Sequence, residues 1–144
     1  MIQKYWGKIS GPLLDRIDLQ IEVPRLKKEE FSLGGEGVPP LAVESSEQIK
    51  QRILAAREIQ EKRYGKKGIL NGQLKGREIK KFVKLEIEAE KILEQALSKF
   101  FLSYRSIEKI LKVSRTIADL EATEKILTAH PAEALNYRLF KSYF

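Results

Sequence analysis

The fold is decided by the stretch that runs from residue 85 to residue 120 and reads LEIEAEKILEQALSKFFLSYRSIEKILKVSRTIADL. Its first part repeats apolar residues at the i, i+4, i+7 and i+8 spacing, which predicts a helix from Leu85 to Phe101. Both phenylalanines at its end, Phe100 and Phe101, are expected in the core. Ser103 then has the character of an N-cap, and a second helix is predicted to run to about Leu120.

The second helix of this pair also has two faces. Its apolar face carries Ile107, Ile110, Leu111, Ser114, Ile117 and Ala118. The opposite face carries Arg105, Glu108, Lys112, Arg115 and Asp119, and a solvated face is the simplest interpretation of this charged set.

Further helices are predicted on both sides of the pair. Ser45 precedes Gln48 at capping-box spacing and opens a helix to about Tyr64, which Gly65 ends. Residues 65–75 form a glycine-containing loop, and a short helix follows over residues 77–83. Pro131 suits the first position of a last helix toward residue 140. The sum is an all-α bundle of four or five helices.

The first 44 residues differ from the rest. They contain four of the five prolines and a glycine- and proline-rich stretch, LGGEGVPP, at residues 33–40. Before it, DLQIEV at residues 18–23 alternates polar and apolar residues, which predicts one short half-buried strand. A lone strand needs a partner, so this arm is either mobile or pairs with sequence that lies elsewhere.

Composition excludes several classes of function. The 144 residues contain no Cys and one His, which excludes a disulfide scaffold, a cysteine nucleophile and a multi-histidine metal site. No metal site is predicted. No apolar run is long enough to span a membrane, and the N-terminus lacks the apolar region of a signal peptide. A cytoplasmic location is expected. There is also no phosphate-binding G-x-x-x-x-G-K-[ST] loop, so this chain should not hydrolyse a nucleotide alone.

Positive charge is concentrated in one segment. Between residues 62 and 84 there are nine basic residues and one acid, Glu78, whereas the net charge of the whole chain is +7. Tyr64 and Phe82 are interleaved with these cations, a pattern suited to following a phosphate backbone and stacking a base. A solvated lysine-rich surface is an equally weighted alternative. The candidate nucleic-acid-binding residues are Lys62, Arg63, Lys66, Lys67, Arg77, Lys80, Lys81 and Lys84.

Four blocks resemble one known family. Residues 10–18 read SGPLLDRID, residues 71–77 read NGQLKGR, residues 114–120 read SRTIADL and residues 132–138 read AEALNYR. In order and spacing they resemble the C-terminal part of magnesium-chelatase-like AAA+ ATPases of the ComM/YifB competence-associated branch. The resemblance covers nearly the whole chain. It implies that residues 1–44 are the end of an ATPase core with a linker, and that residues 45–144 are its helical lid.

The resemblance also implies roles for three arginines. Arg16 matches the arginine of the family's L-x-R-[IF]-D turn and resembles an arginine finger that acts on the neighbouring subunit. On residue types alone, a local salt bridge of Arg16 with Asp15 or Asp18 is the simpler interpretation. Arg105 matches the lid arginine called sensor 2. Arg115 matches another motif arginine, and whether it faces nucleotide or supports the fold stays open.

The function implied is that of the lid of an ATP-driven motor acting on DNA, like a branch-migration helicase in natural transformation. ATP and Mg would bind to the full-length protein, whose upstream core is a partner of this chain. Copies of the full-length protein would form a homo-oligomeric, hexameric ring. DNA is an expected partner. A free-standing DNA-binding helical module and a protein-interaction domain for an acidic partner are the alternatives.

Overall fold

The computed structural model describes residues 11–14, 16–21, 23 and 44–138. Within these ranges the chain is all-α. A four-residue helix, α2 (Gly11–Leu14), precedes five longer elements. These are α3 (Ser46–Tyr64), α4 (Arg77–Phe82), α5 (Ile87–Phe100), α6 (Tyr104–Leu120) and α7 (Ala129–Asn136), with a 3₁₀ turn, η2 (Asn71–Gln73), between α3 and α4.

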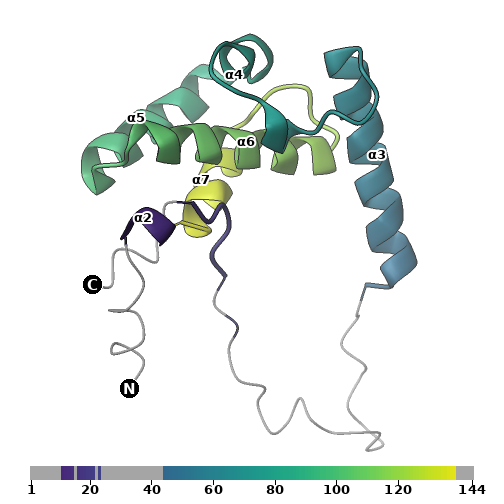
Figure 1. The fold of residues 1–144 in the computed structure, drawn as a ribbon, viewed down its shortest axis with the longest axis horizontal. Coiled ribbons are helices and arrows are strands. Elements are labelled where there is room, and N and C mark those ends of the chain that lie inside the picture. The colour runs from purple at the N-terminus through teal and green to yellow at the C-terminus, as the bar shows by residue number, and fades with distance from the viewer. Residues whose placement is uncertain (1–10, 15, 22, 24–43, 139–144) are drawn as a thin grey trace, which may run out of the picture.

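Helix α6 lies at the centre of the bundle (Figure 1). On one side it packs with α5 and α7 around a core that includes Leu93, Ile110 and Leu135. On the other side Ala118 belongs to a second core with Leu74, Ile79, Val83 and Ile126. Helix α6 therefore contributes buried residues to both hydrophobic cores.

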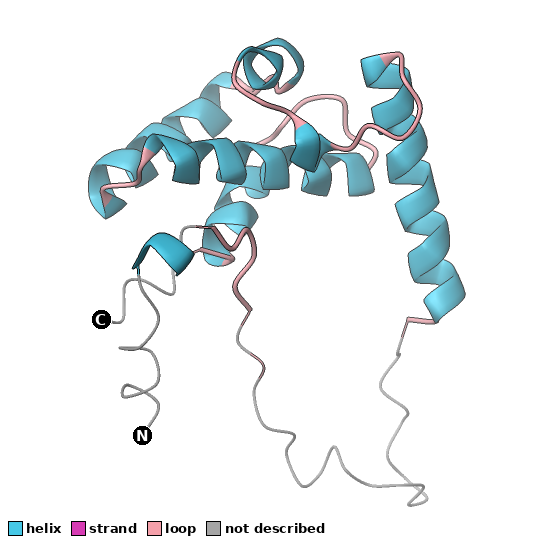
Figure 2. Cartoon of the chain, in the orientation of Figure 1, coloured by secondary structure: helices cyan, strands magenta, loops and turns pink. Residues whose placement is uncertain are grey.

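Local signals explain where the helices begin and end. Ser45 and Gln48 form the predicted capping box at the start of α3, and Gly65 ends that helix at φ 63°. Ser103 caps α6 as predicted, with its Oγ accepting the backbone N–H of Ser106 at 3.2 Å. Loops and turns connect these helices (Figure 2). An isolated parallel bridge joins Leu85 to Ile126.

Helix α3 stands crosswise to α6, and its N-terminal half projects away from the bundle (Figure 1). Ala56 and Gln60 are its only buried residues, and both lie in its C-terminal half. Ile49, Ile53 and Leu54 are exposed. The C-terminal half therefore carries the attachment of this helix to the bundle.

Three expectations about residues of α6, α7 and the end of α5 were wrong. Phe101 is 93% exposed, because it ends α5 in a left-handed conformation that turns its side chain out of the core. Arg115 and Asp119 are buried rather than solvated, because α3 and the 121–126 segment cover that face of α6. Pro131 is the third residue of α7, which begins at Ala129 and ends at Asn136.

The N-terminal arm is described only in part. Residues 18–21 and 23 of the predicted strand are described, and none of them is assigned to a strand. Most of residues 1–44, including residues 33–40, lie outside the described residues. The predicted mobility of the linker concerns these residues.

Candidate functional site

The turn that carries Arg16 follows α2 and is anchored on the bundle. The Arg16 N–H donates to the carbonyl of Leu13 at 3.0 Å, and the Arg16 side chain is exposed. The predicted ion pair with Asp18 is absent among the described residues, since the Asp18 carboxylate contacts Lys109 of α6. The partner proposed alternatively, Asp15, lies outside the described residues.

Arg105 lies in the first turn of α6 and is exposed. The dipole of a helix disfavours a cation at this end, and the first turn of α6 contains no acidic residue to offset it. The next residue, Ser106, is buried and sits within hydrogen-bond distance of the Ser103 hydroxyl and of the Arg138 guanidinium. The backbone beside Arg105 is therefore fixed while its side chain reaches the surface.

Arg115 is used inside the fold. Its side chain is 1% exposed and contacts Asp119 through Nε at 3.0 Å. Its Nη1 donates to the carbonyl of Glu124 at 2.7 Å, and its Nη2 donates to that of Thr123 at 2.6 Å. Burial lowers the pKa of Arg115, and the charge of Asp119 counteracts this effect. Of the two roles that the sequence left open, these contacts favour support of the fold.

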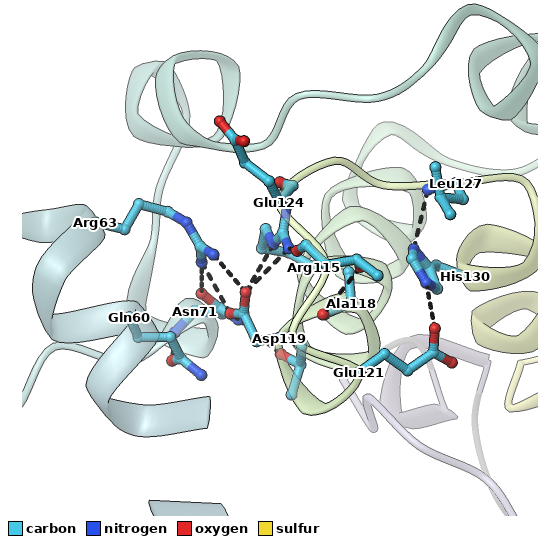
Figure 3. Close-up of polar contacts among 12 residues, drawn as sticks. Gln60, Arg63, Asn71, Arg115, Ala118, Asp119, Glu121, Glu124, Leu127 and His130 are labelled. Atoms are coloured by element: carbon cyan, nitrogen blue, oxygen red, sulfur yellow. Dashed lines mark hydrogen bonds and ion pairs between the residues drawn. The ribbon is translucent and has the colours of Figure 1, made fainter. Parts of the chain in front are cut away.

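Asp119 is the centre of a polar cluster, which we define as Arg63, Asn71, Arg115 and Asp119 (Figure 3). Arg63 is partly buried and the other three residues are buried. Arg63 of α3 forms a bidentate ion pair with the Asp119 carboxylate, with one N–O distance of 2.8 Å. Burial opposes the charge on Arg63, but hydrogen bonding and attraction to Asp119 outweigh it and raise the pKa of Arg63.

Asn71 completes this cluster from η2. Its amide nitrogen donates to Asp119 at 2.8 Å and to the Thr116 hydroxyl at 3.1 Å, and its backbone N–H donates to Gln60 at 2.9 Å. Its amide oxygen accepts the hydroxyl of Tyr64. The 71–77 and 114–120 blocks are therefore brought together through this polar cluster.

The predicted cationic surface is largely present. Eight cations between residues 62 and 84 have exposed side chains on the end of α3, the following loop and α4. They are Lys62, Lys66, Lys67, Lys75, Arg77, Lys80, Lys81 and Lys84, and we call them the lysine-rich surface. Arg63 is the exception, because its guanidinium is paired with Asp119.

The two aromatic residues of this segment pack on each other. The rings of Tyr64 and Phe82 meet edge to face with centroids 5.0 Å apart, and both join the core beneath α4. Lys81 lies over the Phe82 ring at 5.0 Å. These contacts cover ring surfaces that the sequence pattern predicted to stack on bases.

His130 and Arg138 are two further residues to which sequence reasoning assigned no function. His130 is buried, its Nδ1 accepts the backbone N–H of Leu127 at 3.0 Å and its Nε2 lies 2.9 Å from Glu121 (Figure 3). It holds the start of α7, which suits a structural role. Arg138 belongs to the 132–138 block, but no spacing rule links it to the Arg16 turn.

Two classes of site find no support in the part of the chain that the structure describes. No group of three or more His, Cys, Asp or Glu side chains there is arranged to hold a metal ion. No helix among the same residues is long and apolar enough to cross a membrane.

The structure defines an all-α domain built around a central helix, with the side chains of Arg16 and Arg105 exposed. The family model for the C-terminal part of magnesium chelatase subunit ChlI matches residues 43–138, and the chain belongs to this family. The model for magnesium chelatase subunit ChlI itself matches residues 1–31.

Several curated proteins are similar over nearly the whole chain. Competence protein ComM of Haemophilus influenzae is 44% identical over 137 residues, which cover 95% of this chain and 25% of ComM. YifB of Escherichia coli is 42% identical over 94% of this chain and 25% of its own length. An uncharacterised protein of Mycobacterium tuberculosis, Rv2897c, is 33% identical over 94% of this chain and 26% of its own. The chain thus spans about a quarter of the length of these relatives.

Proposed function

We propose that this chain is the helical C-terminal region of a larger AAA+ ATPase that acts on DNA, like a branch-migration helicase in natural transformation. The observation that carries the proposal is the pair of exposed arginines, Arg16 and Arg105, whose neighbouring residues share one buried anchor in Arg138. In this function ATP and Mg bind to an upstream core, and this chain contributes side chains that contact the phosphates.

Each arginine has a distinct part in the proposal. Arg16 acts in trans, as an arginine finger on the nucleotide of the neighbouring subunit in a hexameric ring. Arg105 acts in cis, as the lid arginine that contacts the nucleotide of its own subunit. Arg115 is left out of the proposed site, because all three of its guanidinium nitrogens already have acceptors within the fold.

The lysine-rich surface is the proposed DNA contact. Its cations lie on the end of α3, the following loop and α4, on one side of α6, whereas α2 lies on the other (Figure 1). This separation supports a division in which one side of the module faces nucleotide and the other faces DNA. Contacts would be made to phosphates rather than to bases, since Tyr64 and Phe82 are packed together.

The alternative of a free-standing DNA-binding helical module, which would use a helix-turn-helix, is less well supported. Its recognition helix would be α6, which lies at the centre of the bundle and contributes to both hydrophobic cores. A helix covered in this way has no complete face to place in a major groove.

ATP hydrolysis tests the nucleotide side of the proposal. In the longer protein, Arg16→Ala is expected to lower kcat by about 10³-fold or more, as for other arginine fingers. Arg105→Ala is expected to lower activity as well, and Arg57→Ala, an exposed arginine on α3, serves as the control. Normal hydrolysis by both Arg16→Ala and Arg105→Ala would exclude the proposed roles.

DNA binding tests the other side. Fluorescence anisotropy with single-stranded, duplex and four-way-junction DNA at two salt concentrations should show salt-sensitive binding. Replacing Lys66, Lys67, Lys80 and Lys81 by Gln should abolish it. The matched control replaces four exposed lysines outside this surface, Lys50, Lys91, Lys99 and Lys125. If both quadruple variants bind alike, the surface is not the DNA contact, and an acidic protein becomes the better partner.

A further inference from the structure

We infer that Arg138 is a positioning residue that holds the Arg16 turn against the N-terminal end of α6. This inference rests on the proposed function for the roles of Arg16 and Arg105. It adds that the two arginines are not independent, because one guanidinium bonds the residue that follows each of them, through the backbone carbonyl of Ile17 and the side-chain hydroxyl of Ser106.

The geometry of Arg138 carries the inference. Its Nη1 donates to the carbonyl of Ile17 at 2.9 Å, across 121 positions in the chain, and Ile17 directly follows Arg16. Its Nη2 lies 3.3 Å from the hydroxyl of Ser106, which directly follows Arg105. Arg138 is itself only 9% exposed, so its bond to Ser106 is buried and its bond to Ile17 is partly shielded from water.

Two further contacts hold the same turn to the same helices. The backbone N–H of Gln20 donates to the carbonyl of Tyr137 at 2.8 Å, next to Arg138 in sequence. Lys109, one turn along α6 from Arg105, pairs with Asp18. The Arg16 turn is therefore attached at Ile17, Asp18 and Gln20, and the Arg138 side chain contacts both this turn and the first turn of α6.

Arginine is needed for this bridge because two donors are held in one rigid plane. A lysine keeps the positive charge but presents a single nitrogen on a flexible stem, so it does not bond both acceptors in the same way. Arg138→Lys therefore removes the bridge but keeps the positive charge, whereas Arg138→Gln removes both.

A distance measurement tests the inference without using ATP hydrolysis. The chain contains no Cys, so Arg16→Cys and Arg105→Cys introduce two unique sites for nitroxide labels. Pulsed electron paramagnetic resonance on this labelled chain should give one narrow distance between the labels. Arg138→Gln and Arg138→Lys should each replace it with a broad or divided distribution.

A second label pair, at Lys80→Cys on α4 and Gln95→Cys on α5, reports whether the bundle stays folded in the Arg138 variants. Arg57→Gln, on the exposed face of α3, controls for the loss of an arginine. If the 16–105 distance stays narrow in Arg138→Gln, or if Arg138→Lys restores it, the inference is overturned. Failure of the proposed function is distinguishable, because it appears as normal ATP hydrolysis by Arg16→Ala, whatever the distances are.

Discussion

At the scale of single residues, Asp119 has the most consequential position in the molecule. Its carboxylate is fully buried and receives two guanidinium groups and one amide. Among the described residues, every buried side-chain nitrogen and oxygen atom has a hydrogen-bond partner. A network satisfied in this way fixes one arrangement of α3, η2 and α6, since any other arrangement leaves a buried charge unpaired.

Asp119→Asn is expected to destabilise the fold by about 3–5 kcal/mol, because it leaves the cations of Arg63 and Arg115 without their counter-charge. Urea unfolding followed by circular dichroism measures this free energy. Glu88→Gln is the control, since it breaks an exposed pair with Lys91 and should cost at most about 1 kcal/mol. Equal losses in the two variants would contradict the importance of burial.

The raised pKa of Tyr64 predicts how the free energy of unfolding responds to alkaline pH. Burial raises the pKa of Tyr64 above its usual 10.0, with the hydrogen bond to the Arg63 side chain acting against this effect. Its stabilising contribution is therefore fully present below pH 10.0 and is lost as pH rises through the higher folded-state pKa, because the unfolded chain releases the proton first.

The test compares urea midpoints across this alkaline range for the native chain and Tyr64→Phe. The native chain should lose stability more steeply above pH 10.0 than the variant. Tyr104→Phe is the control, because the side chain of Tyr104 is exposed. Parallel curves for the native chain and Tyr64→Phe would show that burial of Tyr64 does not control the alkaline response.

At the scale of elements, α3 depends on its ends and on its last two turns. The capping box at Ser45 stabilises its start, Gly65 stabilises its end, and its buried residues lie between them in the C-terminal half. Its first half has little packing to compensate for a missing cap. Marginal helices of this kind are sensitive to their termini.

Gly65→Ala is expected to cost about 1–2 kcal/mol, because Gly65 has φ 63° and an L side chain is disfavoured there. A Cβ at this position would meet no atom within 4 Å, so the cost is conformational rather than steric. Gly72→Ala is a matched control, since its Cβ would also meet open space and its φ is not in that region. Thermal unfolding of both variants compares them directly, and equal Tm values would contradict the argument.

At the scale of the whole molecule, charge is distributed unevenly between the two sides of α6. The chain carries a net charge of +7, and the lysine-rich surface holds eight exposed cations with Glu78 among them. A localised surface should bind DNA through specific phosphate contacts, whereas a diffuse net charge would bind in proportion to its total.

The salt dependence of duplex binding distinguishes these cases. The double change Lys66→Gln and Lys67→Gln should reduce the slope of log K against log salt by about 0.9 for each phosphate that is no longer neutralised. The double change Lys91→Gln and Lys99→Gln removes the same net charge from α5 and should leave the slope nearly unchanged. Equal reductions would indicate net charge rather than a defined contact surface.

The sequence alone predicted the helices of the bundle and the ends of α3 and the start of α6. Capping and periodicity act between residues three or four apart, so the local sequence is enough to identify Ser45, Gly65 and Ser103 as helix ends. The placement of most cations at the surface could also be predicted, because lysines that lack nearby acids are rarely buried. The family resemblance was likewise confirmed, by the matches over residues 1–31 and 43–138.

Only the tertiary structure decided which charged residues are internal. Arg63 and Asp119 lie 56 positions apart, and Arg138 and Ile17 lie 121 positions apart. Helical spacing placed Arg115 and Asp119 on a solvated face, because periodicity describes one helix and does not show that a second helix covers its polar side. Burial of those charges depends on long-range packing, and the same packing anchors the Arg16 turn to α6 and α7.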